Sequence, residues 1–353
     1  MIPADSRLLR ALRQEPVDAT PVWFMRQAGR SLARYRELRD RFSFMELATN
    51  ADLAAEITCL PVRSLGVDAA VIFADIMLPL LGMGVEFNLR DSVGPVVATP
   101  IRTKDQVRAL RVVEAEEATP HLFESIRQVR RELSPEKAVI GFGAAPFTLA
   151  CYLVDGQGSR DFPQTRALMR SDPSLWHTLM STLTEVLGRY LRAQVEAGAD
   201  AIQLFDSWAG VVDRASFEAQ VGPHLRRLTG GLRPLAPVIY FSTASFHLLE
   251  AMADCGVDAL SVDWRVAIGE VWRQFGADHS IQGNLDPATV LAPWPVLERE
   301  AMAVLAQVGG RSGHVFNLGH GVLPQSDPDQ LRRLVDLVHG WSPQRGGVPF
   351  PIS

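Results

Sequence analysis

The feature that most constrains this chain is a repeated unit: a short apolar run, a polar residue or glycine at its end, and then a helical pattern. Eight apolar runs have this form: Val22–Met25, Ala69–Phe73, Ala138–Phe142, Ala201–Phe205, Val238–Phe241, Ala259–Val262, Ser280–Gln282 and His314–Asn317. Runs that are apolar on both faces and separated by helices are typical of parallel strands joined through βα units. The repeat therefore predicts a parallel α/β sheet.

Helical patterns are predicted over Asp52–Leu65, Pro120–Arg131, Pro173–Ala197, Phe246–Ala253, Ile268–Phe275, Trp294–Gln307 and Asp327–His339. Two of these segments carry clear start signals, because Ser171 and Asp172 precede Pro173, and Ser326 and Asp327 precede Pro328. These residues offer a capping side chain, and a proline fits the first turn of a helix. The segment Gly84–Arg102 predicts an extra β-hairpin inserted after the second strand.

Eight βα units in 353 residues, with no low-complexity linker, predict one domain over residues 1–353, a (β/α)8 TIM barrel. The alternative is an open doubly wound sheet, which would be expected to show a break in composition along the chain or a nucleotide-binding fingerprint. The one candidate fingerprint, Gly141–Pro146, resembles GxGxxG but ends in proline and lacks a well-placed acidic residue after the next strand. Dinucleotide binding is therefore not expected.

Composition excludes several classes of protein. The formal net charge is -5 and no Lys/Arg-rich run lies outside Arg26–Arg41, which argues against a nucleic-acid binder. No apolar run approaches roughly eighteen residues and the N-terminal segment is amphipathic, so neither a membrane span nor a secretory signal is expected. The three widely spaced cysteines argue against a disulfide framework and suit a reducing, cytoplasmic location.

A cluster of arginines follows the first apolar run: Arg26, Arg30, Arg34, Arg36, Arg39 and Arg41. Guanidinium groups present forked donors that bind planar anions. The last four alternate with Glu37 and Asp40 at helical spacing, so a solvated helix face explains most of them. Arg26 and Arg30 lie at the mouth of an apolar core, and they predict a pocket for a highly anionic small molecule.

In a TIM barrel the active-site residues lie where the strands end. The residues at those ends are Arg26, Asp75, Gly143, Asp206, Ser207, Ser242, Asp263, Asn284, Asp286, Asn317 and His320. No histidine pair has metal-ligand spacing and no HxC or CxxC occurs, so no zinc site is expected. No nucleophile elbow and no P-loop is present.

Each candidate also has a structural interpretation. Asp75 emerges from the apolar run AAVIFA, so it must find donors or shift its pKa upward, but it could equally cap or pair within a barrel. Asp206 is equally ambiguous, and Asp263 is interpreted as structural. His320 lies between two glycines that allow a close approach to a ligand, although a core histidine is the alternative. Tyr152, taken alone, would be a core aromatic.

Six motifs together resemble the uroporphyrinogen decarboxylase family, in the right order over essentially the whole chain. They are VWFMRQAGR at Val22–Arg30, VIFADIMLP at Val71–Pro79, GFGAAPFTLACYLVDG at Gly141–Gly156, QLFDSWAG at Gln203–Gly210, QGNLDP at Gln282–Pro287 and FNLGHGVLP at Phe316–Pro324. The combination of RQAGR with NLGHG is highly specific. The resemblance implies a cofactor-free and metal-free (β/α)8 barrel that forms a homodimer and acts in haem and tetrapyrrole biosynthesis.

The resemblance also implies a substrate and site residues. Uroporphyrinogen carries four pyrroles, each with an acetate and a propionate, and these carboxylates account for an arginine-lined site in an acidic protein. By family match, Asp75 accepts hydrogen bonds from the pyrrole N–H groups, and Arg26 and Arg30 face the acidic side chains. The remaining expected contacts come from Gln27, Ala28, Gly29, Arg39, Tyr152, Phe205, Ser207 and His320.

The implied reaction converts each acetate to a methyl group. Protonation of a pyrrole ring carbon makes a cation that accepts the electrons released with CO2. Ionised Asp75 would stabilise that cation, and Arg26 would hold the reacting carboxylate. The sequence does not assign the general acid, because arginine is a poor proton donor near neutrality.

Two segments depart from the family pattern. Ser31 occupies a position that is often tyrosine, and Tyr240–Phe246 is atypical; neither departure removes a residue assigned to chemistry. Two other functions stay open. A zinc-dependent, cobalamin-related methyltransferase would need a His–Cys–Cys set that the three cysteines do not supply. A tetrapyrrole-binding protein without catalysis would not need Asp75 together with Arg26.

Overall fold

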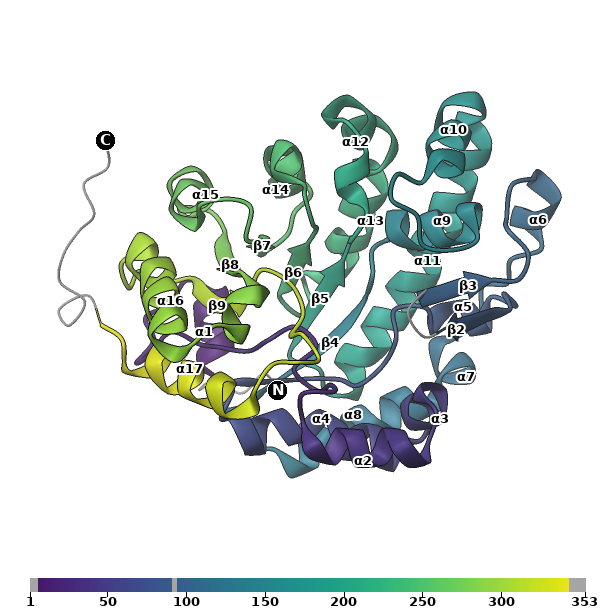
Figure 1. The fold of residues 1–353 in the computed structure, drawn as a ribbon. Coiled ribbons are helices and arrows are strands. Elements are labelled where there is room, and N and C mark those ends of the chain that lie inside the picture. Colours follow the sequence, from purple (N-terminus) through teal and green to yellow (C-terminus); the bar gives the residue numbers. More distant parts are fainter. Residues whose placement is uncertain (1–5, 91–93, 343–353) are drawn as a thin grey trace.

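A computed structural model of the protein describes residues 6–90 and 94–342. At its centre a parallel sheet of seven strands curls around, with helices arranged along its outside (Figure 1). The strand order is β1-β4-β5-β6-β7-β8-β9. Their bounds are β1 Ala69–Val71, β4 Ala138–Ala144, β5 Ala201–Phe205, β6 Val238–Phe241, β7 Ala259–Ser261, β8 Ser280–Leu285 and β9 His314–Leu318. The predicted parallel α/β sheet is confirmed.

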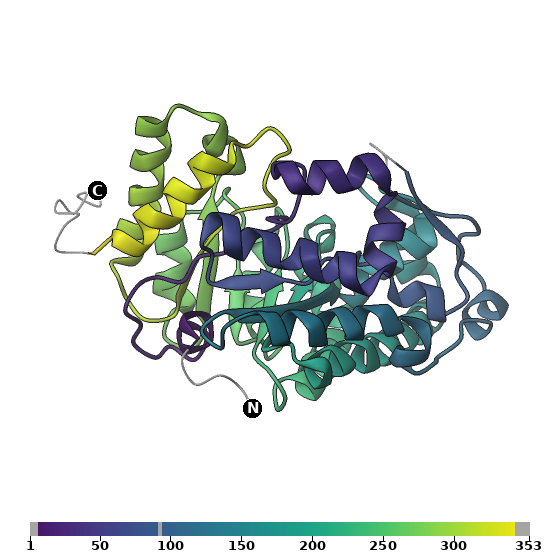
Figure 2. The same cartoon turned by 90° about the horizontal axis from the view of Figure 1, so that it is seen from below.

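The helices that cover the sheet are α4 Ala51–Leu65, α8 Pro120–Glu132, α11 Pro173–Ala197, α13 Gly222–Leu232, α15 Ile268–Phe275, α16 Trp294–Val308 and α17 Pro328–Gly340. Figure 2 shows them from a second direction, packed along the outer face of the strands. Of the predicted capping candidates, the two aspartates and not the serines before them cap the helices. Asp172 accepts a hydrogen bond from the Leu175 N–H at 3.0 Å, and Asp327 accepts one from the Asp329 N–H at 2.9 Å.

The other helices lie in the connections and along the N-terminal part of the chain. They are α1 Arg7–Leu12, α2 Ala33–Arg41, α3 Phe44–Thr49, α5 Pro79–Gly82, α6 Lys104–Arg108, α7 Ala115–Ala118, α9 Pro146–Asp155, α10 Pro163–Ser171, α12 Arg214–Gln220 and α14 Leu249–Ala253, with the 3-10 turns η1 Ala209–Val211, η2 Phe246–Leu248 and η3 Pro287–Leu291. Helix α2 contains the last four arginines of the cluster, α3 follows it, and α9 follows β4 directly.

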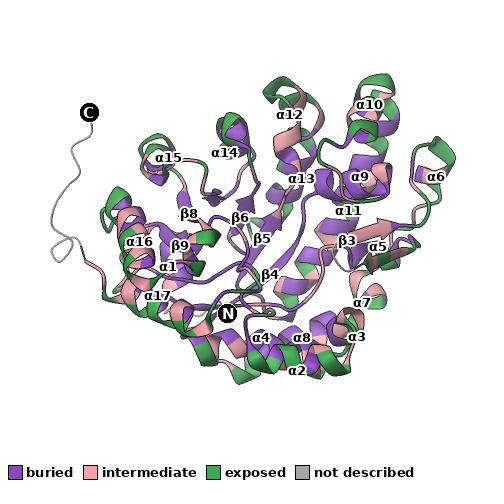
Figure 3. Cartoon of the chain, in the orientation of Figure 1, coloured by how far each residue is buried: buried purple, intermediate pink, exposed green. Residues whose placement is uncertain are grey.

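The strands are buried and the exposed residues lie on the outer helix faces (Figure 3). Polar side chains inside the sheet satisfy one another. The Trp23 indole donates to Gln282 at 3.0 Å, and the Gln282 amide donates to Gln203 at 3.1 Å and to Ser261 at 2.9 Å. Burying a polar group costs free energy unless the group is hydrogen-bonded. Because these polar side chains bond to one another, they can be buried inside the sheet.

The predicted strand at Val22–Met25 is wrong: within it only Val22 forms a bridge, parallel to Phe316 of β9. The physical reason is that side chains take the N–H groups a strand would offer to its neighbour. The N–H groups of Val22, Phe24 and Met25 donate to the side chains of Asp68, Gln27 and Asn317, at 2.8, 3.0 and 3.1 Å. The segment still contacts both edges of the sheet, since Phe316 N donates to Pro21 O at 2.8 Å and Asp68 N donates to Val22 O at 2.8 Å.

An antiparallel pair of strands, β2 (Phe87–Arg90) and β3 (Gly94–Val97), lies within the segment where the sequence predicts a hairpin. Residues 91–93, which connect them, lie outside the described residues. The pair is anchored to the end of α9, because the Val97 N–H donates to the Gly156 carbonyl at 2.7 Å. This places Pro95 of β3 beside the cavity described below.

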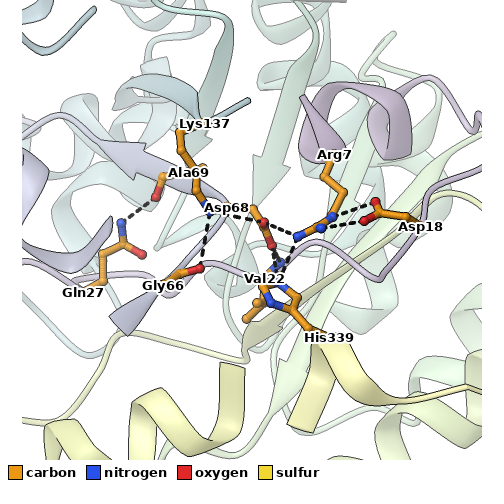
Figure 4. A network of polar contacts seen from close by, with 9 residues as sticks. All are labelled: Arg7, Asp18, Val22, Gln27, Gly66, Asp68, Ala69, Lys137 and His339. Atoms are coloured by element: carbon orange, nitrogen blue, oxygen red, sulfur yellow. Dashed lines mark hydrogen bonds and ion pairs between the residues drawn. The ribbon is translucent and has the colours of Figure 1, made fainter. Parts of the chain in front are cut away.

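Asp68, at the amino end of β1, holds several parts of the chain together (Figure 4). Its carboxylate accepts from Arg7 at 2.9 Å, from His339 at 2.7 Å and from the Val22 N–H at 2.8 Å, and Lys137 lies 3.6 Å away. Burial raises the pKa of Asp68, but the hydrogen bond from His339 and the other donors outweigh it and bring the pKa below its ordinary 3.8. The network thus joins α1, β1 and the last turn of α17.

Replacing Asp68 with alanine is expected to lower the free energy of unfolding by about 3 kcal/mol, because buried donors lose their acceptor. Urea denaturation at neutral pH measures this. Since folding lowers this pKa, the stabilisation is present above pH 3.8 and is lost as pH falls through the folded-state pKa. Asp105→Ala, at an exposed ion pair with Arg108, is the control and should cost little. A loss no larger than that of the control would contradict the prediction.

Candidate active site

A cavity of about 510 Å³ opens at the carboxyl ends of the strands. Ten of the residues predicted from sequence line it: Arg26, Gln27, Ala28, Gly29, Arg30, Asp75, Tyr152, Phe205, Ser207 and His320. They come from the segment after Met25 and from the ends of β1, β5 and β9, with Tyr152 supplied by α9. The structure therefore brings together residues that are far apart in the sequence. Arg39 is the one predicted site residue that does not line the cavity.

Arg26 lies in an unusual backbone conformation, with φ +58°. A left-handed conformation at a residue with a side chain is uncommon, and such conformations cluster at functional sites. A Cβ added to Gly321 would lie 2.5 Å from the Arg26 Cδ. Because Gly321 has no side chain, the Arg26 side chain can pack against it, and the loop after β9 therefore contacts the segment after Met25.

Asp75 lies shortly after β1 and accepts a hydrogen bond from the Met77 N–H at 2.8 Å. Burial raises the pKa of its carboxyl group above the ordinary value. The Met77 N–H and the charge of Arg26 oppose this rise, because both favour the carboxylate. The site therefore contains a carboxylate at a cavity wall, partly compensated by one nearby cation.

His320 is neutral at pH 7, because burial lowers its pKa to about 4. The charges of Arg26 and Arg265 lower the pKa further, while Asp263 raises it. A neutral imidazole can both donate and accept a hydrogen bond. Its ring lies edge-on to Phe241, with centroids 6.0 Å apart.

Tyr152 and Ser207 supply hydroxyl groups. Burial raises the pKa of the Tyr152 phenol, so it is neutral, and its ring lies edge-on to Trp208 at 6.1 Å. The Ser207 carbonyl accepts from the Thr243 hydroxyl at 2.8 Å, which positions the loop after β5. Both hydroxyls are therefore held on ordered elements at the cavity.

Phe205 belongs to an aromatic surface at the strand ends. Its ring lies edge-on to Phe142 at 5.7 Å and to Phe241 at 6.1 Å. All three rings line the cavity. Such a surface fits the apolar faces of a large, flat ligand.

Two predicted residues have structural roles that the sequence did not indicate. Gln27 is buried, and its amide donates to the Ala69 carbonyl at 2.8 Å, so the side chain orders the turn after Met25. Arg39 donates to the Phe42 carbonyl at 2.9 Å, at the end of α2. Its guanidinium therefore stabilises a helix terminus.

Asp206 and Asp263, two of the aspartates at strand ends, do not line the cavity. Asp206 accepts from the Thr148 hydroxyl at 2.7 Å and from the Tyr240 hydroxyl at 2.6 Å, and burial raises its pKa to about 6. Asp263 accepts from the Ala244 N–H at 2.6 Å and from the Arg265 guanidinium at 2.7 Å. Both carboxylates use their acceptor capacity on neighbouring protein groups.

Sequence reasoning missed several lining residues, among them Ser31, Tyr35, Phe44, Phe73, Phe142 and Phe241. The last three lie at or close to the ends of strands β1, β4 and β6, so that position was an available signal. Tyr35 lies on α2, where the helical spacing of the arginines predicts only a solvated face, and Phe44 lies on α3, a helix that the sequence did not predict. Ser31 had been noted as a departure from the family but had no assigned contact.

The site combines two arginines, one carboxylate, neutral hydrogen-bonding groups and an aromatic surface. This set can bind a large apolar ring bearing carboxylates and can stabilise a positive charge beside Asp75. Among residues 6–90 and 94–342, no three His, Cys, Asp or Glu side chains lie together as a metal site would require. In the same ranges no helix is both long enough and apolar enough to cross a membrane.

Known proteins resemble this chain along most of its length. Residues 3–341 match the family model described as uroporphyrinogen decarboxylase (URO-D). Uroporphyrinogen decarboxylase of Sorangium cellulosum is 48% identical over 334 residues, covering 94% of this chain and 95% of that protein. An enzyme of the same name from Thermus thermophilus is 48% identical over 332 residues, covering 94% of this chain and 96% of that protein.

A solved structure named as a methyltransferase from Methanosarcina mazei has the same fold, with a TM-score of 0.77. The two structures match over 95% of this chain and 97% of the methyltransferase chain, at 23% sequence identity. Likeness at this level of identity concerns the arrangement of strands and helices and does not extend to the reaction.

Proposed function

Since this chain belongs to the uroporphyrinogen decarboxylase family, we propose that it converts uroporphyrinogen III to coproporphyrinogen III in haem and tetrapyrrole biosynthesis. Each of the four acetate side chains becomes a methyl group. The observation that carries this proposal is the placement of Asp75 beside Arg26 in a cavity with a second arginine and an aromatic surface.

The chemistry begins with a proton added to the pyrrole ring carbon next to the one that bears the acetate. The resulting cation draws electrons from the bond between the acetate methylene and its carboxylate, so that bond breaks and CO2 leaves. A proton then adds to the methylene carbon, and the ring carbon loses its extra proton. The net reaction consumes one proton and releases one CO2 for each acetate, and the substrate's own ring serves as the electron sink.

The protein stabilises this sequence through fixed charges. Ionised Asp75 would accept hydrogen bonds from the pyrrole N–H groups and favour the cation as it forms. Arg26 would hold the reacting carboxylate, and Arg30 would bind a carboxylate that does not react. Tyr152, Ser207 and neutral His320 would hydrogen-bond other carboxylates, while Phe205 would contact the ring face.

We further propose that the chain is one (β/α)8 barrel domain in which Pro21–Met25 occupies the eighth strand position. The backbone bonds from Phe316 on one side and Asp68 on the other support this placement. The resemblance also supports a cytoplasmic homodimer that needs no cofactor. Sedimentation of the purified protein measures its oligomeric state.

The test of the proposed function is anaerobic incubation of the purified protein with uroporphyrinogen III, followed by separation of the oxidised products by carboxylate number. We expect porphyrins with seven, six and five carboxylates and finally coproporphyrin, without added cofactor and at the same rate after treatment with a strong chelator. Absence of decarboxylated products would contradict the function. Stoichiometric bound metal with chelator-sensitive turnover would overturn the cofactor-free mechanism.

A further inference from the structure

Tyr35, on α2, lines the cavity and has no role in the mechanism above. Only 6% of the surface of Tyr35 is exposed to solvent. The ring lies edge-on to Phe73 with centroids 5.7 Å apart, and Phe73 in turn lies 5.1 Å from Phe44. Three aromatic rings from three different segments therefore fix the position of the phenol.

Within residues 6–90 and 94–342 the Tyr35 hydroxyl has no hydrogen-bond partner on the protein, and it is not among the buried polar atoms that lack one, so it is accessible from the cavity. The hydroxyl of a tyrosine whose ring is buried usually meets a hydrogen-bond partner. A phenol with a packed ring and an unused hydroxyl at a cavity wall is therefore arranged to meet a ligand.

Two arginine side chains lie near the Tyr35 phenol. Burial raises the pKa of Tyr35, and the charges of Arg39 and Arg30 act in the opposite direction. Both guanidinium groups are thus close enough to influence the phenol, although only Arg30 lines the cavity. With a raised pKa the hydroxyl keeps its proton at neutral pH, so it can donate to an anion.

The turn that leads into α2 is held in one conformation. One nitrogen of the Arg36 guanidinium donates to the Arg30 carbonyl at 2.9 Å and to the Ser31 carbonyl at 2.8 Å. Because Arg30 precedes this turn and Tyr35 follows it, their relative position is fixed before a ligand arrives. Such preorganisation lowers the conformational entropy lost on binding.

We propose that the Tyr35 hydroxyl donates a hydrogen bond to a non-reacting substrate carboxylate that pairs with Arg30. The two groups form a carboxylate subsite on the α2 wall, apart from Arg26 and Asp75. This inference rests on the proposed function, because it concerns how the same polycarboxylate substrate is held. A hydrogen bond from a neutral hydroxyl to a carboxylate is short and strong.

The subsite should affect binding more than chemistry. A contact to a carboxylate that does not react is equally strong in the ground state and the transition state, so its loss raises KM and leaves kcat unchanged. Tyr35→Phe removes the hydroxyl and keeps the ring that packs on Phe73. We expect a KM for uroporphyrinogen about tenfold higher, with kcat within about twofold of wild type.

Tyr190→Phe is the matched control for KM, because Tyr190 is also buried with its ring edge-on to a phenylalanine, Phe123, but does not line the cavity. We expect no change in KM for this variant. A Tyr35→Phe protein with wild-type KM, or with reduced kcat and unchanged KM, would overturn the inference.

A double-mutant cycle tests whether both groups hold the same carboxylate. Binding of uroporphyrin, the stable oxidised form, is measured by fluorescence quenching for wild type, Tyr35→Phe, Arg30→Ala and the double variant. Groups that share a carboxylate should lose less affinity together than the sum of the single losses. Additive losses would show that the two side chains bind different carboxylates and would refute the shared subsite.

These outcomes are distinct from failure of the proposed function. A wild-type protein that binds uroporphyrin but releases no decarboxylated product contradicts the function, while the binding cycle still decides the role of Tyr35. If the wild-type protein decarboxylates uroporphyrinogen and Tyr35→Phe has the same KM, only the proposed role of Tyr35 is contradicted.

Discussion

Replacing Asp75 with asparagine is expected to reduce kcat by about 10²–10³-fold while the protein folds normally. The amide has the shape of the carboxylate and can still accept the hydrogen bond that the Met77 N–H donates. It lacks the negative charge that would favour the cationic intermediate. Steady-state decarboxylation of uroporphyrinogen, with circular dichroism as the folding measurement, tests this.

The same carboxylate should determine the acid limb of the pH profile. Burial raises the pKa of Asp75 above its ordinary 3.8, so the carboxyl becomes protonated at a higher pH than a solvated aspartate. Because the ionised form is required, activity is present above the raised pKa and falls as pH decreases through it. We expect this limb to be absent from the residual activity of Asp75→Asn.

Asp286→Asn is the matched control for this change. Asp286 also follows a strand, but its carboxylate accepts from the Ala288 N–H at 2.9 Å, which an asparagine can also satisfy. Asp286 does not line the cavity, so turnover should be close to wild type. Near wild-type turnover by Asp75→Asn would instead remove Asp75 from the mechanism.

Replacing Arg26 with lysine is expected to lower kcat/KM by about 100-fold, because lysine offers a point charge in place of a planar fork. Lysine keeps the charge that lowers the pKa of Asp75 and His320, so the loss would report bidentate geometry. Arg26→Ala should lose at least as much. Full activity of Arg26→Lys would show that a point charge suffices.

Gly321→Ala tests the same guanidinium without changing it. The added methyl group would meet the Arg26 Cδ at 2.5 Å, so the arginine must move. We expect kcat/KM to fall by about tenfold or more, since small misplacements of a catalytic group are costly. Gly230→Ala, where a Cβ meets nothing within 4 Å, is the control. Equal activity of both glycine variants would contradict the importance of this contact.

The regular elements could be predicted because their signals are local. Apolar runs such as Ala201–Phe205 and Val238–Phe241 coincide with β5 and β6, and Pro173–Ala197 coincides with α11. Parallel strands end at one edge of a sheet, so residues that follow them gather there whatever their distance along the chain. This is why Arg26, Asp75 and His320 could be placed together from the sequence.

The segment at Val22–Met25 shows where local signals fail. Its apolar composition is that of a strand, but the side chains of Asp68, Gln27 and Asn317 accept three of its N–H groups, while the Trp23 N–H donates to the Phe316 carbonyl. Asp68 and Asn317 lie far away in the sequence, so the partner of each N–H depends on the tertiary structure. Periodicity reports burial and does not report the bonding partner.

What the sequence by itself determined is the parallel α/β sheet and the set of polar residues at its carboxyl edge. The residue patterns alone did not distinguish Asp75 from Asp206, and the family resemblance selected Asp75. The tertiary structure gave the physical reason, because Asp75 lines the cavity with Arg26 whereas Asp206 is bonded by Thr148 and Tyr240. Both aspartates follow apolar runs, so their sequence patterns are equivalent. The difference lies in which distant donors packing brings to each carboxylate, and the same packing placed Tyr35 in the cavity wall.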